Sequence, residues 1–243
     1  MAALHPRDLR IRRADLPLLG LFGVFGLGAI QGSYYEAIQR LPLGVALAIQ
    51  YTGTLLMLLW ARVTGWRVGS RLWLAAALAI VGAFFVVGAY DAELRALNAA
   101  GAAIAVLSAA IYAFGFIVAE RILRRYSVWT LLVYGFGFAL VAWSVFRPPW
   151  ALPWAALEPT TAALVAGVVI VGSVVPFALT FAALSMVPAA RVGLVSTFEP
   201  VVGALAAWLV LSETLELAQL VGGVLVLAGI AIAQSLRPTA DSV

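Results

Sequence analysis

The stretch Ser196–Thr214, STFEPVVGALAAWLVLSET, places the carboxylate of Glu199 and the ring of Pro200 inside a long apolar run. Pro200 has no backbone N–H, so the carbonyl of Ser196, four residues earlier, loses its usual helical partner. An unpaired carbonyl and a charged side chain are both costly in contact with lipid. We therefore expect this surface to face protein or water in the interior of a membrane protein.

The rest of the chain has the same apolar character. Hydrophobic residues make up 64% of the 243 residues and charged residues only 11%, whereas globular domains have about 25% charged residues. The apolar residues form blocks long enough to cross a hydrocarbon core about 30 Å thick. The sequence therefore predicts an all-α polytopic membrane bundle of about eight transmembrane helices, at residues 16–35, 44–60, 72–89, 99–119, 128–146, 162–184, 192–211 and 217–236.

The arginines indicate how the chain crosses the membrane. With a cytoplasmic N-terminus, 12 of the 15 arginines lie in cytoplasmic segments and three lie in the opposite loops. This asymmetry follows the positive-inside rule. We expect an integral protein of the cell (inner or plasma) membrane with both termini in the cytoplasm. A cleaved secretory signal is the competing interpretation of the first block, but that block is long and lacks a convincing A-x-A site.

Several functional classes lack the residues they need. Cysteine is absent, the single histidine is His5 in the N-terminal tail, and all four aspartates lie outside the predicted spans. Thiolate nucleophiles, histidine-metal sites and paired intramembrane aspartates are therefore excluded. The phosphate-binding pattern GxxxxGK[ST] does not occur. We expect no enzyme, no cofactor and no metal, and the dispersed arginines indicate no nucleic-acid partner.

An internal repeat appears at an offset of 146 residues. YEAIQRLPLGVALAIQYTGTLLMLL, from Tyr35, aligns with FAALSMVPAARVGLVSTFEPVVGAL, from Phe181, and Pro42 falls on Pro188. The first three spans then match the last three, so the repeating unit has five spans and reverses its orientation when repeated. We predict an inverted five-helix repeat with an incomplete first copy of three helices, residues 1–90, and a complete second copy, residues 91–243. This register implies two more spans, about 45 to 50 residues, before Met1.

Two segments carry a recognisable pattern: residues 101–125, GAAIAVLSAAIYAFGFIVAERILRR, and residues 198–230, FEPVVGALAAWLVLSETLELAQLVGGVLVLAGI. The second closely resembles the closing segment, and the first is similar to the opening, of the EamA domain of the drug/metabolite transporter superfamily. The resemblance implies ten spans in two halves, cytoplasmic ends and a central substrate cavity. The residues that carry the closing pattern are Glu199, Pro200, Glu213, Gly222 and Gly229.

The first half departs from this pattern at two positions. Thr54 stands where the family pattern has its proline, and Arg67 stands where it has its second glutamate. The first half therefore lacks both the proline and the second glutamate of the family pattern.

Polar residues at corresponding depths indicate a substrate site. Glu199 lies about 12 Å from the cytoplasmic start of its span at 1.5 Å per residue, and the repeat sets residues 50–54 opposite the Glu-Pro break. Interrupted spans in corresponding positions of two inverted halves are the best sequence indication of a transporter's binding site. We also expect Gln31 and Tyr34 to face Pro176 and Thr180. The predicted substrate-binding residues are Glu199, Ser196, Thr197, Pro200, Gln50, Tyr51, Thr54, Gln31, Tyr34 and Tyr112.

Individual acids have alternative explanations. Our hypothesis is that Glu199 is the protonatable group that couples transport to a proton gradient, and a structural hydrogen bond or snorkelling to the surface are the alternatives. Glu36 is interpreted as a solvated residue at an outer span end. Glu213 and Glu216 are interpreted as capping or ordering the turn 212–217.

Together these features predict a secondary transporter, an exporter, of a small polar organic metabolite such as an amino acid or amine across the inner membrane. The alternative is a non-transporting membrane fragment or helical scaffold from a truncated gene. The predicted partners are a small-molecule substrate and the lipid bilayer, and a homodimer stays open.

Overall fold

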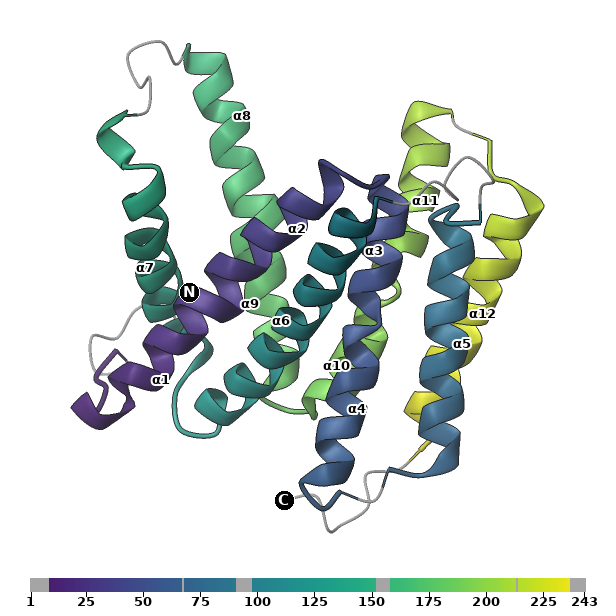
Figure 1. The fold of residues 1–243 in the computed structure, drawn as a ribbon, viewed down its shortest axis with the longest axis horizontal. Coiled ribbons are helices and arrows are strands. Elements are labelled where there is room, and N and C mark those ends of the chain that lie inside the picture. The colour runs from purple at the N-terminus through teal and green to yellow at the C-terminus, as the bar shows by residue number, and fades with distance from the viewer. Residues whose placement is uncertain (1–8, 67, 91–97, 152–157, 213, 237–243) are drawn as a thin grey trace. The chain divides into compact units, whose positions relative to one another are not determined.

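A computed structural model describes residues 9–66, 68–90, 98–151, 158–212 and 214–236, and these residues contain helices and no strand (Figure 1). Within this part of the chain, seven helical runs are long and apolar enough to cross a membrane. A further apolar helix, Ser70–Val86, has 17 residues, which is the short end of the spanning range. The eight segments overlap the eight predicted spans one for one, so the prediction of an all-α polytopic membrane bundle is confirmed.

Four of the spans are uninterrupted helices and four are built from consecutive pieces. The uninterrupted spans are α5 (Ser70–Val86), α6 (Ala99–Leu123), α7 (Val128–Phe146) and α12 (Leu217–Ser235). The first span consists of η1 (Arg13–Asp15), α1 (Leu16–Leu21), the π-helical η2 (Phe22–Ala29) and α2 (Ile30–Ile38). The sixth span consists of α8 (Pro159–Val169), the π-helical η6 (Ile170–Val174) and α9 (Val175–Leu184). The second joins α3 (Leu43–Tyr51) and α4 (Gly53–Val63), and the seventh joins α10 (Ala189–Ser196) and α11 (Glu199–Leu211); a short 3-10 turn, η4 (Pro149–Ala151), follows α7.

Several helix bounds repeat at the same 146-residue offset as the internal sequence repeat. The first span, Arg13–Ile38, and the sixth, Pro159–Leu184, are displaced by 146 residues at both ends. The second and seventh spans begin at Leu43 and Ala189 and resume after their interruptions at Gly53 and Glu199, which is again the same displacement. The first and sixth spans thus share both bounds at this offset, and the second and seventh share their starts and restarts.

The third span is shorter than predicted because a glycine ends it. We predicted residues 72–89, but α5 ends at Val86. Gly88 adopts a positive φ of 67°, its N–H donates to the Phe85 carbonyl at 3.1 Å, and the Ala89 N–H donates to the Phe84 carbonyl at 3.0 Å. This pair of bonds with a left-handed glycine satisfies the last carbonyls of a helix and stops it.

The chain divides into two compact units, residues 1–29 with 115–188 and residues 30–114 with 189–243. In the first unit, η2 packs closely on α6 and α7. A Cβ at Gly23 would lie 2.6 Å from the Gly135 carbonyl oxygen, and one at Gly26 would lie 3.1 Å from the Gly115 Cα. The indole N–H of Trp143 donates to the Gly28 carbonyl at 3.2 Å. Glycines therefore allow η2 to approach its neighbours at backbone distance.

In the second unit, the closest packing joins α5 to α12. A Cβ at Gly82 would lie 2.6 Å from the Gly222 carbonyl oxygen, and one at Gly229 would lie 2.5 Å from the Ala75 carbonyl oxygen. Ala79 is fully enclosed between these contacts. The two helices run antiparallel, because the later residue of α5 meets the earlier residue of α12. Small residues that allow close backbone approach are typical of helix interfaces in membranes.

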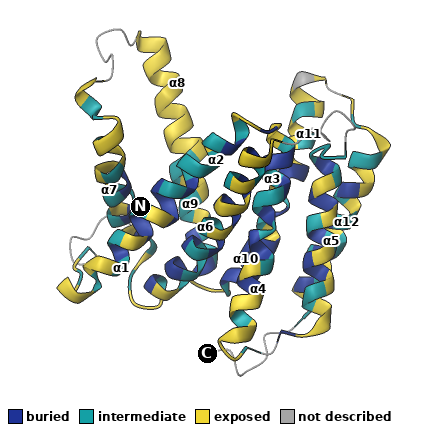
Figure 2. Ribbon diagram, in the orientation of Figure 1, coloured by how far each residue is buried: buried dark blue, intermediate teal, exposed yellow. Residues whose placement is uncertain are grey.

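Many large apolar side chains lie on the surface of the helices and not at the close helix contacts. Leucines, valines and aromatic residues are exposed along most spans, and α8 is exposed along its whole length (Figure 2). Such an extensive apolar surface would be covered by acyl chains in a bilayer. The close packing of small residues and the extensive exposed apolar surface together indicate an integral membrane protein.

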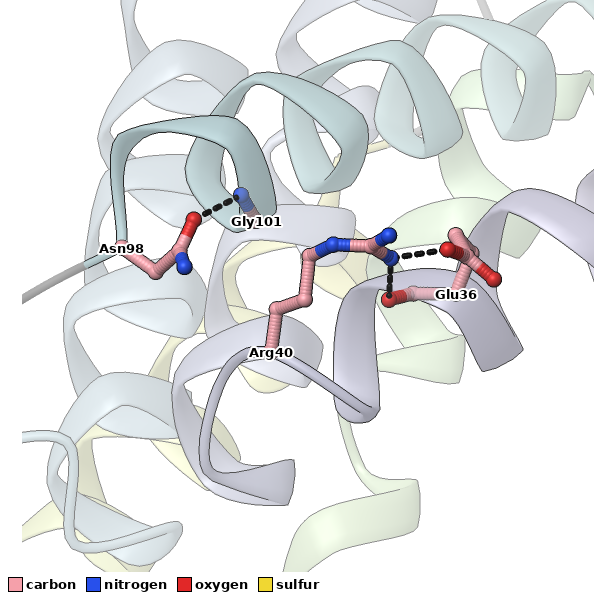
Figure 3. A network of polar contacts seen from close by, with 4 residues as sticks. All are labelled: Glu36, Arg40, Asn98 and Gly101. Atoms are coloured by element: carbon pink, nitrogen blue, oxygen red, sulfur yellow. Dashed lines mark hydrogen bonds and ion pairs between the residues drawn. The ribbon is translucent and has the colours of Figure 1, made fainter.

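Polar side chains form local contacts at helix ends in the second unit (Figure 3). Arg40 forms an ion pair with Glu36 and donates to the Glu36 backbone carbonyl at 3.0 Å, and Asn98 Oδ1 accepts from the Gly101 N–H at 3.0 Å at the start of α6. Glu216 caps α12 in a reciprocal box with Gln219, which confirms its predicted role. Glu213 and Arg67 lie outside the described residues.

The α5–α12 contact predicts a difference between two matched glycine substitutions. Gly82→Ala places a Cβ against the backbone of α12, and overpacking of this kind costs about 1–3 kcal/mol. Gly137→Ala adds the same atom in α7, where a Cβ meets nothing within 4 Å. We expect a lower melting temperature for Gly82→Ala than for Gly137→Ala, measured on purified protein in detergent. Equal melting temperatures would show that the close approach is absent.

Candidate functional site

The interruptions of the second and seventh spans lie side by side in the second unit. A Cβ at Gly193 would lie 3.3 Å from Thr54 Oγ1 and 2.9 Å from the sulfur of Met57, whereas Tyr51 contacts Glu199. The residue numbers rise along one segment as they fall along the other, so the two spans are antiparallel here. This opposite direction is what an inverted repeat requires of equivalent spans.

The two segments are joined by a hydrogen bond between side chains. The Tyr51 hydroxyl donates to Glu199 Oε2 at 3.1 Å. Tyr51 is only 4% exposed, whereas Glu199 is exposed. Glu199 is also the first residue of α11, where the unpaired N–H groups of the helix favour a negative charge. The Glu199 carboxylate is therefore held by a hydrogen bond from a buried phenol, while the residue remains exposed.

Two more tyrosines surround this pair. Tyr34 on α2 and Tyr112 on α6 both lie within electrostatic range of the Glu199 carboxylate. Tyr112 also makes a side-chain hydrogen bond with Ser196, the last residue of α10. Tyrosines from three different spans thus lie near one acid, and Tyr51 is hydrogen-bonded to it. We define this group, Tyr34, Tyr51, Tyr112, Ser196 and Glu199, as the tyrosine–glutamate cluster.

Threonine hydroxyls stabilise both interruptions. Thr52 Oγ1 donates to the Ile49 carbonyl at 2.5 Å, and Thr197 Oγ1 donates to the Leu194 carbonyl at 2.6 Å. Each bond satisfies a carbonyl three residues earlier, in competition with the helical pattern. Pro200 has no N–H to donate to the Ser196 carbonyl, and the chain is interrupted there between α10 and α11.

The remaining predicted site residues are placed differently. Thr54 and Thr197 are fully enclosed and Pro200 is buried, so none of them presents a side chain to an open surface in this structure. Gln31 and Gln50 are half-buried. Gln50 Oε1 and Thr54 Oγ1 have no hydrogen-bond partner among the described residues.

The predicted approach of Gln31 and Tyr34 to Pro176 and Thr180 stays a prediction, because Pro176 and Thr180 belong to the other unit.

Ser108 is a buried polar residue that was not predicted as part of the site. Ser108 on α6 is 1% exposed, and its hydroxyl has no hydrogen-bond partner among the described residues. It lies four residues before Tyr112, hence on the same helix face. That spacing was the available signal, but a lone serine in an alanine-rich helix does not stand out. In the described part of the chain, no group of three or more His, Cys, Asp and Glu residues could hold a metal ion.

Comparison with known proteins identifies the family. The model of the EamA-like transporter family matches residues 1–88 and 99–234. The chain belongs to the EamA-like transporter family. It is 29% identical over 232 residues to an uncharacterized transporter of Archaeoglobus fulgidus, an alignment that covers 95% of this chain and 81% of that protein.

Two further relatives of this EamA-family chain are exporters. It is 27% identical to the threonine/homoserine exporter RhtA of Escherichia coli K12, over 90% of this chain and 72% of the exporter. It is also 27% identical to RhtA of Salmonella typhimurium LT2, over 88% of this chain and 70% of the exporter. A crystal structure with 20% sequence identity aligns with a TM-score of 0.74 and covers 96% of this chain and 79% of that chain, which shows the shared fold.

The antiparallel contact between the interrupted spans predicts a specific crosslink. The natural chain has no cysteine, so Thr54→Cys with Gly193→Cys introduces the only thiols. Because a Cβ at position 193 lies 3.3 Å from the Thr54 hydroxyl, a disulfide can form across the two spans. We expect an oxidant-dependent linked peptide by mass spectrometry.

Thr54→Cys with Gly203→Cys is the control pair, since a Cβ at Gly203 meets nothing within 4 Å. Equal crosslinking of both pairs, or none in the 54/193 pair, would contradict the arrangement.

Proposed function

We propose that the chain is a secondary exporter of small polar metabolites that carry an amino group, and that the tyrosine–glutamate cluster binds that group. The observation that carries this proposal is the hydrogen bond from a buried tyrosine to the carboxylate of the exposed residue Glu199, where two antiparallel, interrupted spans meet. Neutral amino acids are the first substrates to test, with threonine and homoserine suggested by the RhtA relatives.

The position of the cluster supports a transport role. Secondary transporters with inverted repeats place substrate sites near the middle of interrupted helices at the repeat interface. Here the helix bounds of the first and sixth spans, and the starts and restarts of the second and seventh spans, repeat at an offset of 146 residues. The family model also matches in two stretches. We therefore propose two repeats, and the arginine asymmetry supports cytoplasmic termini.

The chemistry of the cluster suits a substrate ammonium group. A carboxylate accepts charge-assisted hydrogen bonds from an ammonium, which are about twice as strong as neutral ones. Tyrosine rings add cation–π attraction when a cation lies over their faces. The Tyr51 hydroxyl occupies one acceptor position on Oε2, and the carboxylate has further acceptor positions on Oε1 and Oε2 for a ligand. The hydroxyls of Tyr34, Tyr112 and Ser196 can form hydrogen bonds with the polar groups of the substrate next to its amine.

The same carboxylate offers a way to couple transport to protons. A carboxyl group that holds either a proton or a substrate ammonium, but not both, exchanges one for the other. Protonation of Glu199 from the outer side would release the amine there, and loss of that proton inside would restore binding. Export driven by an inward proton gradient follows from this exchange.

Replacement of the acid tests the proposal directly. Glu199→Gln keeps the size and an acceptor oxygen but removes the charge, so we expect at least about a tenfold loss of pH-gradient-driven amino-acid transport. The assay uses purified protein in proteoliposomes with a panel of radiolabelled amino acids that includes threonine. Glu36→Gln is the control, because Glu36 is an exposed acid that pairs with Arg40 outside the cluster.

Unchanged gradient-driven transport by Glu199→Gln would refute a role for this acid in coupling. Transport lost equally in Glu36→Gln would indicate a general effect of removing an acid.

A second substitution separates the phenol from the acid. Tyr51→Phe removes the hydrogen bond to Glu199 but keeps the ring and the acid, so we expect weaker substrate affinity by about three- to tenfold with coupling retained. The measurement is the concentration dependence of initial transport rates at two pH values. An unchanged half-saturating concentration would show that Tyr51 does not orient the carboxylate.

A further inference from the structure

A small hollow lies outside the tyrosine–glutamate cluster, in the first unit. It is lined by the start of the first span and by the end of α6 with the turn that follows: Asp15, Leu18, Leu19, Arg121, Ile122, Arg125 and Tyr126. All of these residues lie at span ends, where a bilayer places its head groups. The hollow combines an apolar wall with two guanidinium groups, a composition that the transport proposal does not use.

Among the described residues, Asp15 is the acid that lines the hollow, and it already has partners. The Tyr126 hydroxyl donates to Asp15 Oδ2 at 2.6 Å, and Arg125 Nη1 lies 3.5 Å from Asp15 Oδ1. The Arg12 backbone N–H donates to the Tyr126 oxygen at 3.1 Å. This network ties the start of the first span to the turn after α6 and leaves Asp15 neutralised by Arg125.

Arg121 is the second arginine of the hollow, and its positive charge is not used by Asp15. Its side chain is exposed, and no carboxylate among the described residues forms an ion pair with it. By contrast, Arg124, three residues later, pairs with Glu120 at 3.2 Å and does not line the hollow. The floor beside Arg121 is apolar, since Leu19 and Ile122 are fully buried and Leu18 is half-buried. The hollow therefore presents an unpaired cation next to a hydrocarbon surface.

We propose that this hollow binds an anionic phospholipid, with the head-group phosphate on Arg121 and the start of an acyl chain against Leu18. Basic pockets between transmembrane helices on the cytoplasmic side bind anionic head groups, and each arginine near the surface contributes about 1 kcal/mol. The occupant needs both a phosphate and an apolar chain, because the hollow offers both kinds of surface. The bound lipid would join the first span to the turn between α6 and α7.

The test compares two neighbouring arginines. Purified full-length protein is titrated with dioleoyl phosphatidylglycerol or dioleoyl phosphatidylcholine in detergent micelles, and bound lipid is counted by native mass spectrometry alongside the melting temperature. We expect phosphatidylglycerol to bind more tightly and to raise the melting temperature. Arg121→Gln should weaken this binding about fivefold, whereas Arg124→Gln, which removes the same charge, should not.

Two further arms identify the ligand. Arg121→Lys retains the charge and should retain most of the phosphatidylglycerol binding, and the effect should decrease with added salt. Glycerol 1-phosphate, the soluble head-group fragment, should not stabilise the protein. Equal losses in Arg121→Gln and Arg124→Gln would overturn the site, and stabilisation by glycerol 1-phosphate would overturn the assignment of a lipid.

Discussion

The hydrogen bond between Tyr51 and Glu199 is the interaction on which the proposed chemistry depends. It connects the second and seventh spans where both helices stop and restart. A carboxylate inside a membrane protein needs partners, because an unpaired charge in hydrocarbon is costly. A single buried phenol and the start of α11 supply part of that stabilisation, and the exposed side of the carboxylate is left for a ligand. The arrangement stabilises the acid without neutralising it.

The packing of the second unit makes this arrangement possible. Membrane helices associate through close contact of small residues, because no hydrophobic effect drives them together inside lipid. Gly82, Gly222 and Gly229 allow α5 and α12 to meet at backbone distance, and Gly53 does the same for α4 with α6. Gly193 of α10 packs against the side chains of Thr54 and Met57 on α4. Interrupted spans have fewer helical hydrogen bonds, so they rely on such rigid neighbours for their position.

The sequence predicted the spans well, because the length of an apolar block is set by bilayer thickness. The seventh-span interruption was signalled by Pro200, whereas the second-span interruption has no proline and was signalled by the polar residues 50–54 together with the repeat. The contact of Tyr51 with Glu199 could not be predicted, since it depends on the crossing angle and rotamers of two distant helices. Sequence pattern also could not show that Thr54 and Thr197 are enclosed. The π-helical segments η2 and η6 have no reliable sequence signature.

Chemical labelling of Glu199 is the most direct test of the claim that this acid receives the substrate amine. The purified protein is treated with a hydrophobic carbodiimide, and modification of Glu199 and Glu36 is measured by peptide mass spectrometry. We predict that Glu199 is labelled, that a transported amino acid protects it, and that the N-acetyl derivative of the same amino acid does not. Labelling of Glu199 that a transported amino acid leaves unchanged would contradict the account.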